Sequence, residues 1–145
     1  MKAVIKLLKL TAIAIAVLIG LFLLSLTCVP RPGMENTSII RTRLEIGDLN
    51  FSLNHYKSVY GGYPTGEYSN IVSVLAGDNP QKVVFLNFRR TSEHPNVMVD
   101  PWGMPYQIIF LQQTNFIIRS AGKDKIFGNA DDIVFNSASN DFVKP

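Results

Sequence analysis

The sequence predicts an α+β fold in which a hydrophobic N-terminal helix is followed by a long amphipathic helix packed on a small antiparallel sheet. Three observations support this prediction. Residues 10–28 form an apolar run without charge, residues 39–60 repeat apolar side chains at helical spacing, and the C-terminal half holds short runs of β-branched and aromatic residues. Helical patterns that precede the strand patterns, rather than alternating with them, are typical of the α+β class.

The apolar run of residues 10–28 predicts a membrane-spanning or signal helix. At about 1.5 Å per residue it comes close to crossing a hydrocarbon core of roughly 30 Å. Lys2, Lys6 and Lys9 precede the run and should stay in the cytoplasm, so the rest of the chain is expected outside it. The predicted organisation is therefore a signal or membrane anchor (1–29), a Pro/Gly linker (30–34) and a globular domain (35–145).

Three fates of the N-terminal segment stay open: a permanent anchor, a cleaved signal peptide, and a lipoprotein signal that ends at Cys28. Cys28 is the sole cysteine and stands at the end of the apolar run, where a lipid could be attached, although Thr27 and Ser25 fit such a signal poorly. A single cysteine also excludes an intramolecular disulfide. The exported domain must therefore be stabilised by its core and by any metal that it binds.

The basic net charge reflects membrane topology rather than a nucleic-acid partner. The formal charge of +3 equals the contribution of Lys2, Lys6 and Lys9, so basic and acidic side chains balance in the rest of the chain. A balanced domain gives no electrostatic reason to expect binding to a phosphate backbone. We therefore predict no nucleic-acid binding.

A long helix is predicted after Pro30 and Pro32, two residues that interrupt a helix because they lack the amide donor. Asn36, Thr37 or Ser38 could cap its N-terminus. Its apolar stripe, interrupted by Thr42, consists of Ile39, Ile46, Leu49, Leu53, Tyr56 and Tyr60. The helix should end at Gly61, which suits the left-handed position after the last helical residue, and Pro64 should hold the chain extended.

A shorter helix and four strands are predicted in the remaining chain. The helix covers Tyr68–Leu75 and directs Ser69, Ile71, Val72 and Leu75 inward. Strand patterns, rich in β-branched and aromatic residues, occur at Lys82–Phe88, Tyr106–Leu111, Asn115–Arg119 and Asp132–Phe135. The second and third of these strands should form a hairpin.

A rigid turn is predicted at residues 99–106. Asp100 can accept hydrogen bonds from the amides that follow it, Pro101 fixes φ, and Gly103 relieves the last turn position. Trp102, the only tryptophan, is expected to anchor the turn on the sheet. A platform for a carbohydrate or a protein partner is the alternative role.

An acidic loop near the C-terminus carries the best candidate site. Asp124, Asp131 and Asp132 offer oxygen ligands, while Gly122 and Gly128 let the backbone fold back so that carbonyls could complete a shell of about six to eight oxygens. No His or Cys lies nearby in the sequence, which argues against zinc. From these residues alone, a calcium site and a plain acidic turn between two strands both stay open.

No catalytic constellation is visible. The two histidines are His55, inside the long helix, and His94, in a predicted loop, and neither has a nucleophile at a recognisable spacing. Cys28 belongs to the membrane segment. We therefore predict that the protein is not an enzyme.

Several motifs follow one another in a characteristic order: Tyr56-Lys57, Gly62-Tyr63-Pro64-Thr65, Asp100-Pro101-Trp102-Gly103-Met104-Pro105-Tyr106, and Ser120-Ala121-Gly122-x-Asp124 followed by Asp131-Asp132-Ile133. Together they resemble the major pseudopilin of type II secretion systems over about residues 35–135. The resemblance implies a pilin-like head that binds structural calcium, with Asp124, Asp131 and Asp132 as side-chain ligands. It also implies that the carbonyls of Ala121 and Ile126 are main-chain ligands.

The resemblance further implies a structural subunit of a short periplasmic fibre, held at the bacterial inner membrane with its head in the periplasm or outside the cell. Its partners would be other pseudopilin-like subunits and the secretion machinery. The N-terminus departs from the family pattern, because Gly20-Leu21-Phe22 is a faint counterpart of the leader cleavage site and Ser25 occupies the place of a glutamate. The alternative is therefore a membrane-anchored or lipidated envelope module that reuses the pseudopilin head as a binding module without forming a fibre.

Overall fold

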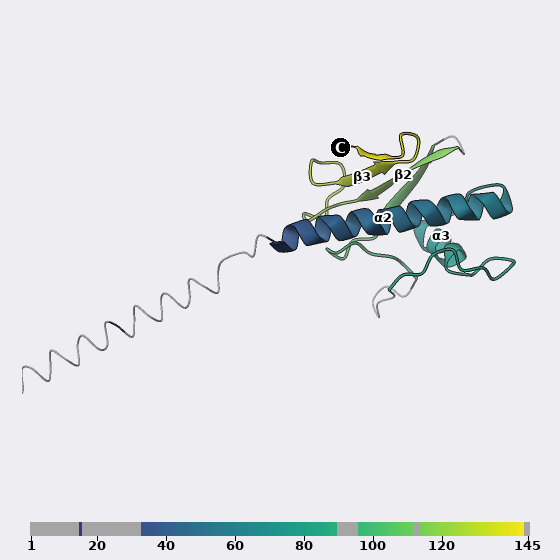
Figure 1. Cartoon of the computed structure of the whole chain (residues 1–145), viewed down its shortest axis with the longest axis horizontal. Coiled ribbons are helices and arrows are strands. Elements are labelled where there is room, and N and C mark those ends of the chain that lie inside the picture. The colour runs from purple at the N-terminus through teal and green to yellow at the C-terminus, as the bar shows by residue number, and fades with distance from the viewer. Residues whose placement is uncertain (1–14, 16–32, 90–95, 112–113, 144–145) are drawn as a thin grey trace, which may run out of the picture. The chain divides into compact units, whose positions relative to one another are not determined.

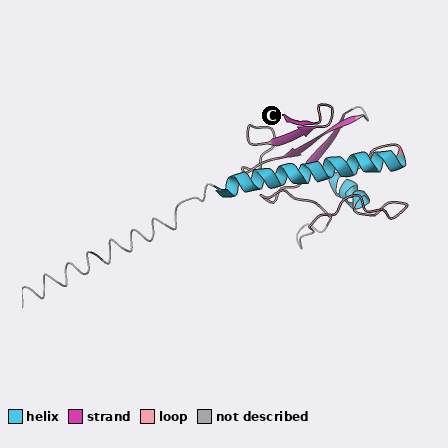
Figure 2. Ribbon diagram, viewed as in Figure 1, coloured by secondary structure: helices cyan, strands magenta, loops and turns pink. Residues whose placement is uncertain are grey.

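The computed structural model describes residues 15, 33–89, 96–111 and 114–143. Its contacts divide the chain into residues 1–34 and residues 35–145. The second unit confirms the predicted α+β fold, since a long helix packs on a four-stranded antiparallel sheet (Figures 1 and 2). Apart from Ile15, the predicted membrane segment lies outside the described residues, as do Cys28, the candidate lipidation site, and His94.

Helix α2 spans Gly33–Tyr60 and forms one wall of the core. Ile46, Leu49 and Leu53 are fully buried, which confirms the centre of the predicted stripe. Thr42, which interrupts this stripe, is buried as well, and its hydroxyl donates to the carbonyl of Ser38 at 2.9 Å. The polar residue is tolerated there because its own helix satisfies the hydroxyl.

The predicted start of α2 was wrong. Asn36, Thr37 and Ser38 lie inside the helix, which begins at Gly33 instead of at one of these capping residues. Their low helix propensity is a weak preference, a few tenths of a kcal/mol per residue, and the packing of the downstream stripe overrides it. The predicted end is confirmed, because Gly61 has a φ of 79° and its amide donates to the Lys57 carbonyl at 2.8 Å.

Helix α3 spans Tyr68–Leu75, as predicted. Ile71, Val72 and Leu75 are buried, but Ser69 is exposed, so its predicted inward position was wrong. The hydroxyl of Tyr68 donates to the carbonyl of Met98 at 3.0 Å. This bond fastens the start of α3 to the segment that precedes the sheet.

The sheet consists of β1 (Gln107–Leu111), β2 (Asn115–Ser120), β3 (Ile133–Asn136) and β4 (Asp141–Val143), in that order and antiparallel throughout. The predicted hairpin is confirmed, with Gln107 opposite Arg119 and Leu111 opposite Asn115. Strand β4 was not predicted. It is three residues long and pairs Phe142 with Phe135, which is too short a run for a recognisable periodicity.

The strand predicted at Lys82–Phe88 was wrong, because the segment lies outside the sheet. The amides of Phe85 and Leu86 both donate to the carbonyl of Leu75, at 2.8 and 3.0 Å, and the hydroxyl of Ser52 donates to the carbonyl of Phe85 at 2.8 Å. Phe85 and Leu86 are buried in the core beside α2 and α3. The β-branched and aromatic composition thus reflects core packing rather than strand pairing.

The turn at residues 99–106 has the predicted hydrogen bonds. One oxygen of Asp100, Oδ1, accepts from the amides of Trp102 and Met104 at 3.0 and 2.9 Å, and Gly103 has a φ of 87°. The other oxygen accepts from the hydroxyl of Ser120 at 2.6 Å. Asp100 therefore joins the turn to the end of β2.

No helix in the described ranges is long and apolar enough to span a membrane.

Candidate cation-binding loop

The acidic loop, defined here as residues 121–132, connects β2 to β3 and is closed at its base by the pairing of Ser120 with Ile133. Its two limbs touch at Gly122, where a Cβ atom would lie 2.3 Å from the carbonyl oxygen of Asp131. Gly122 also has a φ of 67°. The glycine is needed both for its left-handed backbone and for the close approach, and it keeps the loop folded on itself.

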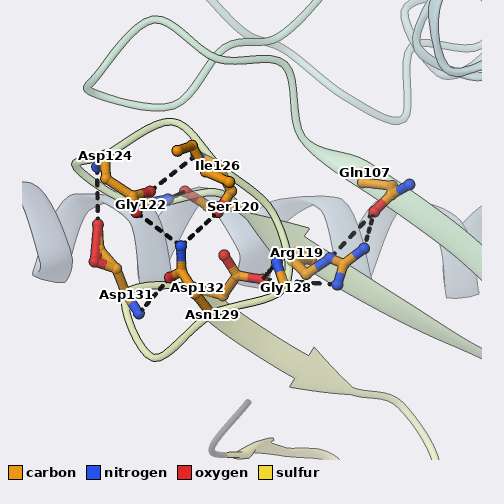
Figure 3. Close-up of polar contacts among 10 residues, drawn as sticks. All are labelled: Gln107, Arg119, Ser120, Gly122, Asp124, Ile126, Gly128, Asn129, Asp131 and Asp132. Carbon is orange, nitrogen blue, oxygen red and sulfur yellow. Dashed lines mark hydrogen bonds and ion pairs between the residues drawn. The ribbon is translucent and has the colours of Figure 1, made fainter.

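Asp124 and Asp131 form hydrogen bonds within this loop (Figure 3). The amide of Asp124 donates to Oδ2 of Asp131 at 2.9 Å, and the amide of Ile126 donates to Oδ1 of Asp124 at 2.9 Å. Carboxylates held by backbone amides in this way have fixed positions. The carboxylate of Asp131 therefore lies against the backbone of Asp124 across the loop.

Asn129 joins the two limbs and was missed by the sequence analysis. Its Nδ2 donates to Oδ2 of Asp124 at 2.7 Å and to the carbonyl of Ile126 at 3.0 Å, while its Oδ1 accepts from the amide of Asp131 at 2.8 Å. The spacing Asn129-x-Asp131 is the pattern of an Asx turn and could have signalled this role.

Asp132 is the most buried carboxylate of the loop, with a side-chain exposed fraction of zero. Its Oδ2 accepts from the amide of Gly128 at 2.8 Å and lies 3.6 Å from Nη1 of Arg119. Its Oδ1 is buried and has no hydrogen-bond partner in the described structure. A buried carboxylate oxygen without a donor is costly, and a cation would satisfy it.

Arg119 supports the loop from β2 and was also missed. Its guanidinium donates to the side-chain oxygen of Gln107 and lies 5.0 Å from the ring centre of Phe127, in addition to its ion pair with Asp132. The side chain therefore ties the loop to the first strand of the hairpin (Figure 3). An arginine within a strand pattern gives no sequence signal for such a contact.

The residues present fit a hard cation in their chemistry. Asp124, Asp131 and Asp132 all belong to one short loop. Their carboxylate oxygens are the type of ligand atom that calcium prefers. Of the two predicted carbonyl ligands, Ala121 is buried and Ile126 is exposed. As the side chains lie, no three Asp, Glu, His or Cys residues within the described ranges are close enough together to hold a metal ion. Calcium binding therefore stays a prediction.

His55 lies far from this loop in the sequence, on the exposed side of α2. Its ring contacts those of Phe51 and Phe85, at centroid distances of 5.8 and 5.0 Å. These aromatic contacts give His55 a packing role on the surface of α2.

Comparison with protein families supplies the identity of the fold. The family model described as type II secretion system (T2SS), protein G matches residues 32–136. The chain belongs to this family. Protein G is the major pseudopilin of the secretion system, so the resemblance predicted from the motifs is confirmed.

The match includes α2, the Asp100 turn and the whole acidic loop. Pseudopilins are structural rather than catalytic proteins of the cell envelope. No match was found among curated proteins or among solved structures.

Proposed function

We propose that this protein is a non-catalytic structural subunit or accessory of a type II secretion system, with a head that bound calcium stabilises. The match to the pseudopilin family over residues 32–136 supports the secretion role. Residues 10–28 would hold the protein in the bacterial inner membrane, with the head in the periplasm or outside the cell. The unpartnered oxygen of Asp132 is the observation that carries the calcium proposal.

Calcium would be held by the carboxylates of Asp124, Asp131 and Asp132 together with the carbonyls of Ala121 and Ile126. The bound ion supplies positive charge to a loop whose three carboxylates otherwise repel one another. The protein's own contribution is orientation, because backbone amides and Asn129 already fix two of the carboxylates. Calcium would therefore stabilise the folded head by binding it in preference to the unfolded chain.

Thermal unfolding of residues 33–145, in calcium and in excess chelator, tests this proposal. Extracellular calcium modules have dissociation constants of about 10⁻⁴–10⁻³ M, so calcium near 10 mM should stabilise the head by roughly 1.4–2.7 kcal/mol. Asp124→Ala and Asp131→Ala should abolish the increase in Tm. Asp78→Ala is the matched control, because Asp78 is exposed and pairs with Lys82 away from the loop. An equal increase in all variants would contradict the proposal.

The alternative is an envelope binding module that uses the pseudopilin head without assembling. Ser25 in place of the family's glutamate and the weak leader around Gly20 favour it. The mass of the chain extracted from membranes separates the two functions. A product that begins at Leu21 supports a processed fibre subunit, whereas an uncut chain or a lipid on Cys28 supports the binding module.

A further inference from the structure

The tip of the acidic loop, defined here as residues 123–127, presents an apolar side chain to solvent. Ile126 has an exposed fraction of 63 %, whereas the next side chain, Phe127, is half-buried. The backbone of Ile126 is fixed on both sides, because its amide donates to Asp124 at 2.9 Å and its carbonyl accepts from Asn129 at 3.0 Å. The folded loop therefore holds the isoleucine side chain outward.

Two lysines belong to the same tip. Lys123 and Lys125 are exposed, and Lys125 has a left-handed backbone with a φ of 63°. A single exposed isoleucine is ordinary on a protein surface. An isoleucine beside two lysines, however, has the composition of a segment that lies in a membrane interface. There the apolar side chain enters the acyl boundary, and the lysines reach the lipid phosphates.

Calcium would reverse the charge of the loop that carries this tip. Residues 121–132 contain two lysines and three aspartates, which give a formal charge of −1 that becomes +1 with Ca²⁺ bound. The surface of an anionic bilayer therefore repels the ion-free loop and attracts the loaded one. A charge change of this kind is a local electrostatic switch.

The acidic loop lies beside the first turns of α2. Ile39 and Arg43 of the helix and Lys123 of the loop line one hollow. At about 1.5 Å per residue, these two helix positions stand about 9–15 Å from Gly33, where α2 begins. The chain from residue 28, where the proposed anchor ends, to Gly33 spans at most about 18 Å. The loop can therefore reach the surface of the membrane that holds the anchor.

We propose that residues 123–127 dock on an anionic phospholipid bilayer when the loop holds calcium, with Ile126 in the interface and both lysines on lipid phosphates. This inference rests on the calcium site and the membrane anchor of the proposed function. The contact is weak by its size, because each lysine strengthens binding to an anionic surface only roughly fivefold. The anchor raises the effective concentration of the bilayer at the loop, so docking is a property of the full chain in its membrane.

Fluorescence quenching in vesicles that contain the full chain tests the docking. In a Cys28→Ser background, a nitrobenzoxadiazole probe is attached to Ile126→Cys, and spin-labelled lipids quench it on contact. In calcium, with roughly a third phosphatidylglycerol in phosphatidylcholine, quenching should be roughly threefold or more above that of the same probe on Val84→Cys. Val84 is the control, because it is apolar, 62 % exposed and outside the loop. Excess chelator, or phosphatidylcholine alone, should lower the quenching at residue 126 to that of the control.

Quenching at residue 126 that never exceeds the control would overturn the proposal and leave the tip to a protein partner. Equally strong quenching in chelator or in phosphatidylcholine alone would overturn the charge reversal. The Tm of the unlabelled full chain in the same vesicles, followed by the fluorescence of Trp102, the only tryptophan, tests the calcium site separately. A Tm that rises with calcium while the probe stays unquenched overturns docking alone. If calcium changes neither the Tm nor the quenching, the calcium site and docking both fail.

Removal of one lysine charge tests the electrostatic contribution. In the chain labelled at residue 126, Lys125→Gln should lower the ratio of docked to free probe roughly fivefold in calcium. Lys82→Gln is the matched control and should leave this ratio unchanged, because Lys82 is also exposed, has a φ of 55° and lies outside the loop. Equal ratios in the two variants would overturn the contact between Lys125 and lipid.

Discussion

Gly122 occupies the point of the acidic loop where a side chain would be least tolerated. In Gly122→Ala the new Cβ would meet the carbonyl of Asp131, and the residue would keep a φ of 67°. We expect the free energy of unfolding to fall by about 2–4 kcal/mol in urea titrations. Gly128→Ala is the matched control, since Gly128 has a φ of 97° but no atom within 4 Å of its Cβ position, and it should lose about 1 kcal/mol. Equal losses would contradict the close contact.

Arg119 compensates the buried charge of Asp132. The loss of stability on removing Arg119 should therefore depend on whether calcium is present. Arg119→Met leaves the carboxylate without its cation, so the free energy of unfolding should fall by about 2–3 kcal/mol in chelator. The loss should be smaller in calcium, because the ion neutralises the same carboxylate. Gln107→Met removes only the hydrogen bond between β1 and β2 and serves as the control in the same titrations. A loss that calcium leaves unchanged would contradict a shared role of Arg119 and the ion.

The acidic loop could be predicted as far as its three carboxylates and its two glycines, whereas their role as calcium ligands stays a prediction. Asp124, Asp131 and Asp132 stand out because three carboxylates within nine residues are unusual between two strands. The bridging role of Asn129 and the support from Arg119 could not be predicted, because both depend on how the limbs of the loop meet. The same holds for Oδ1 of Asp132, whose lack of a partner is a property of packing.

At the scale of elements, local pattern predicted the helices and the hairpin, but it missed the edge strand β4 and wrongly placed a strand at Lys82–Phe88. Tyr68–Leu75 has a helical spacing that its packing preserves, and the two strands of the hairpin are neighbours in sequence. Lys82–Phe88 has a strand composition, yet its backbone donates to the end of α3. A strand is defined by a partner, and nothing within the segment indicates whether one is present.

Two buried tyrosines near the contact between α2 and the start of β1 should make the free energy of unfolding fall at alkaline pH. Tyr106 is buried and donates to Glu45 at 2.6 Å, and Tyr68 is largely buried. Burial raises the pKa of both phenols above the ordinary value of about 10, and the hydrogen bond to Glu45 raises the pKa of Tyr106 further. In the unfolded chain the phenols lose their protons from about pH 10, while in the folded protein they keep them.

Stability should therefore be constant below about pH 10 and fall above it, by up to about 1.4 kcal/mol per pH unit for each tyrosine. Urea unfolding between pH 8 and 11 measures the slope. Tyr106→Phe should lose about 1–2 kcal/mol at pH 8 with its hydrogen bond, and its decline above pH 10 should be shallower. A decline as steep as in the unmodified protein would show that Tyr106 ionises equally in both states.

At the scale of the whole molecule, the two sides of α2 differ in their burial. Ile46, Leu49 and Leu53 are fully buried and stabilise the head, whereas Ile40, Leu44 and Phe51 on the opposite side are exposed. The acidic loop connects two strands of the sheet and contains none of these residues.

We expect the three N-terminal lysines to set the direction in which the proposed membrane segment inserts. The domain balances its own charges, so Lys2, Lys6 and Lys9 provide the asymmetry that should keep the N-terminus in the cytoplasm and export the head. With alkaline phosphatase fused after Pro145, which is active only outside the cytoplasm, we expect the Lys2→Gln, Lys6→Gln and Lys9→Gln triple variant to lose most of its activity at equal expression. The control is a triple variant that removes the same charge from the head: Lys57→Gln, Lys82→Gln and Lys125→Gln. Its fused phosphatase should stay active. Equal phosphatase activity in the two triple variants would show that export of the head does not depend on Lys2, Lys6 and Lys9. The predicted topology would then be wrong.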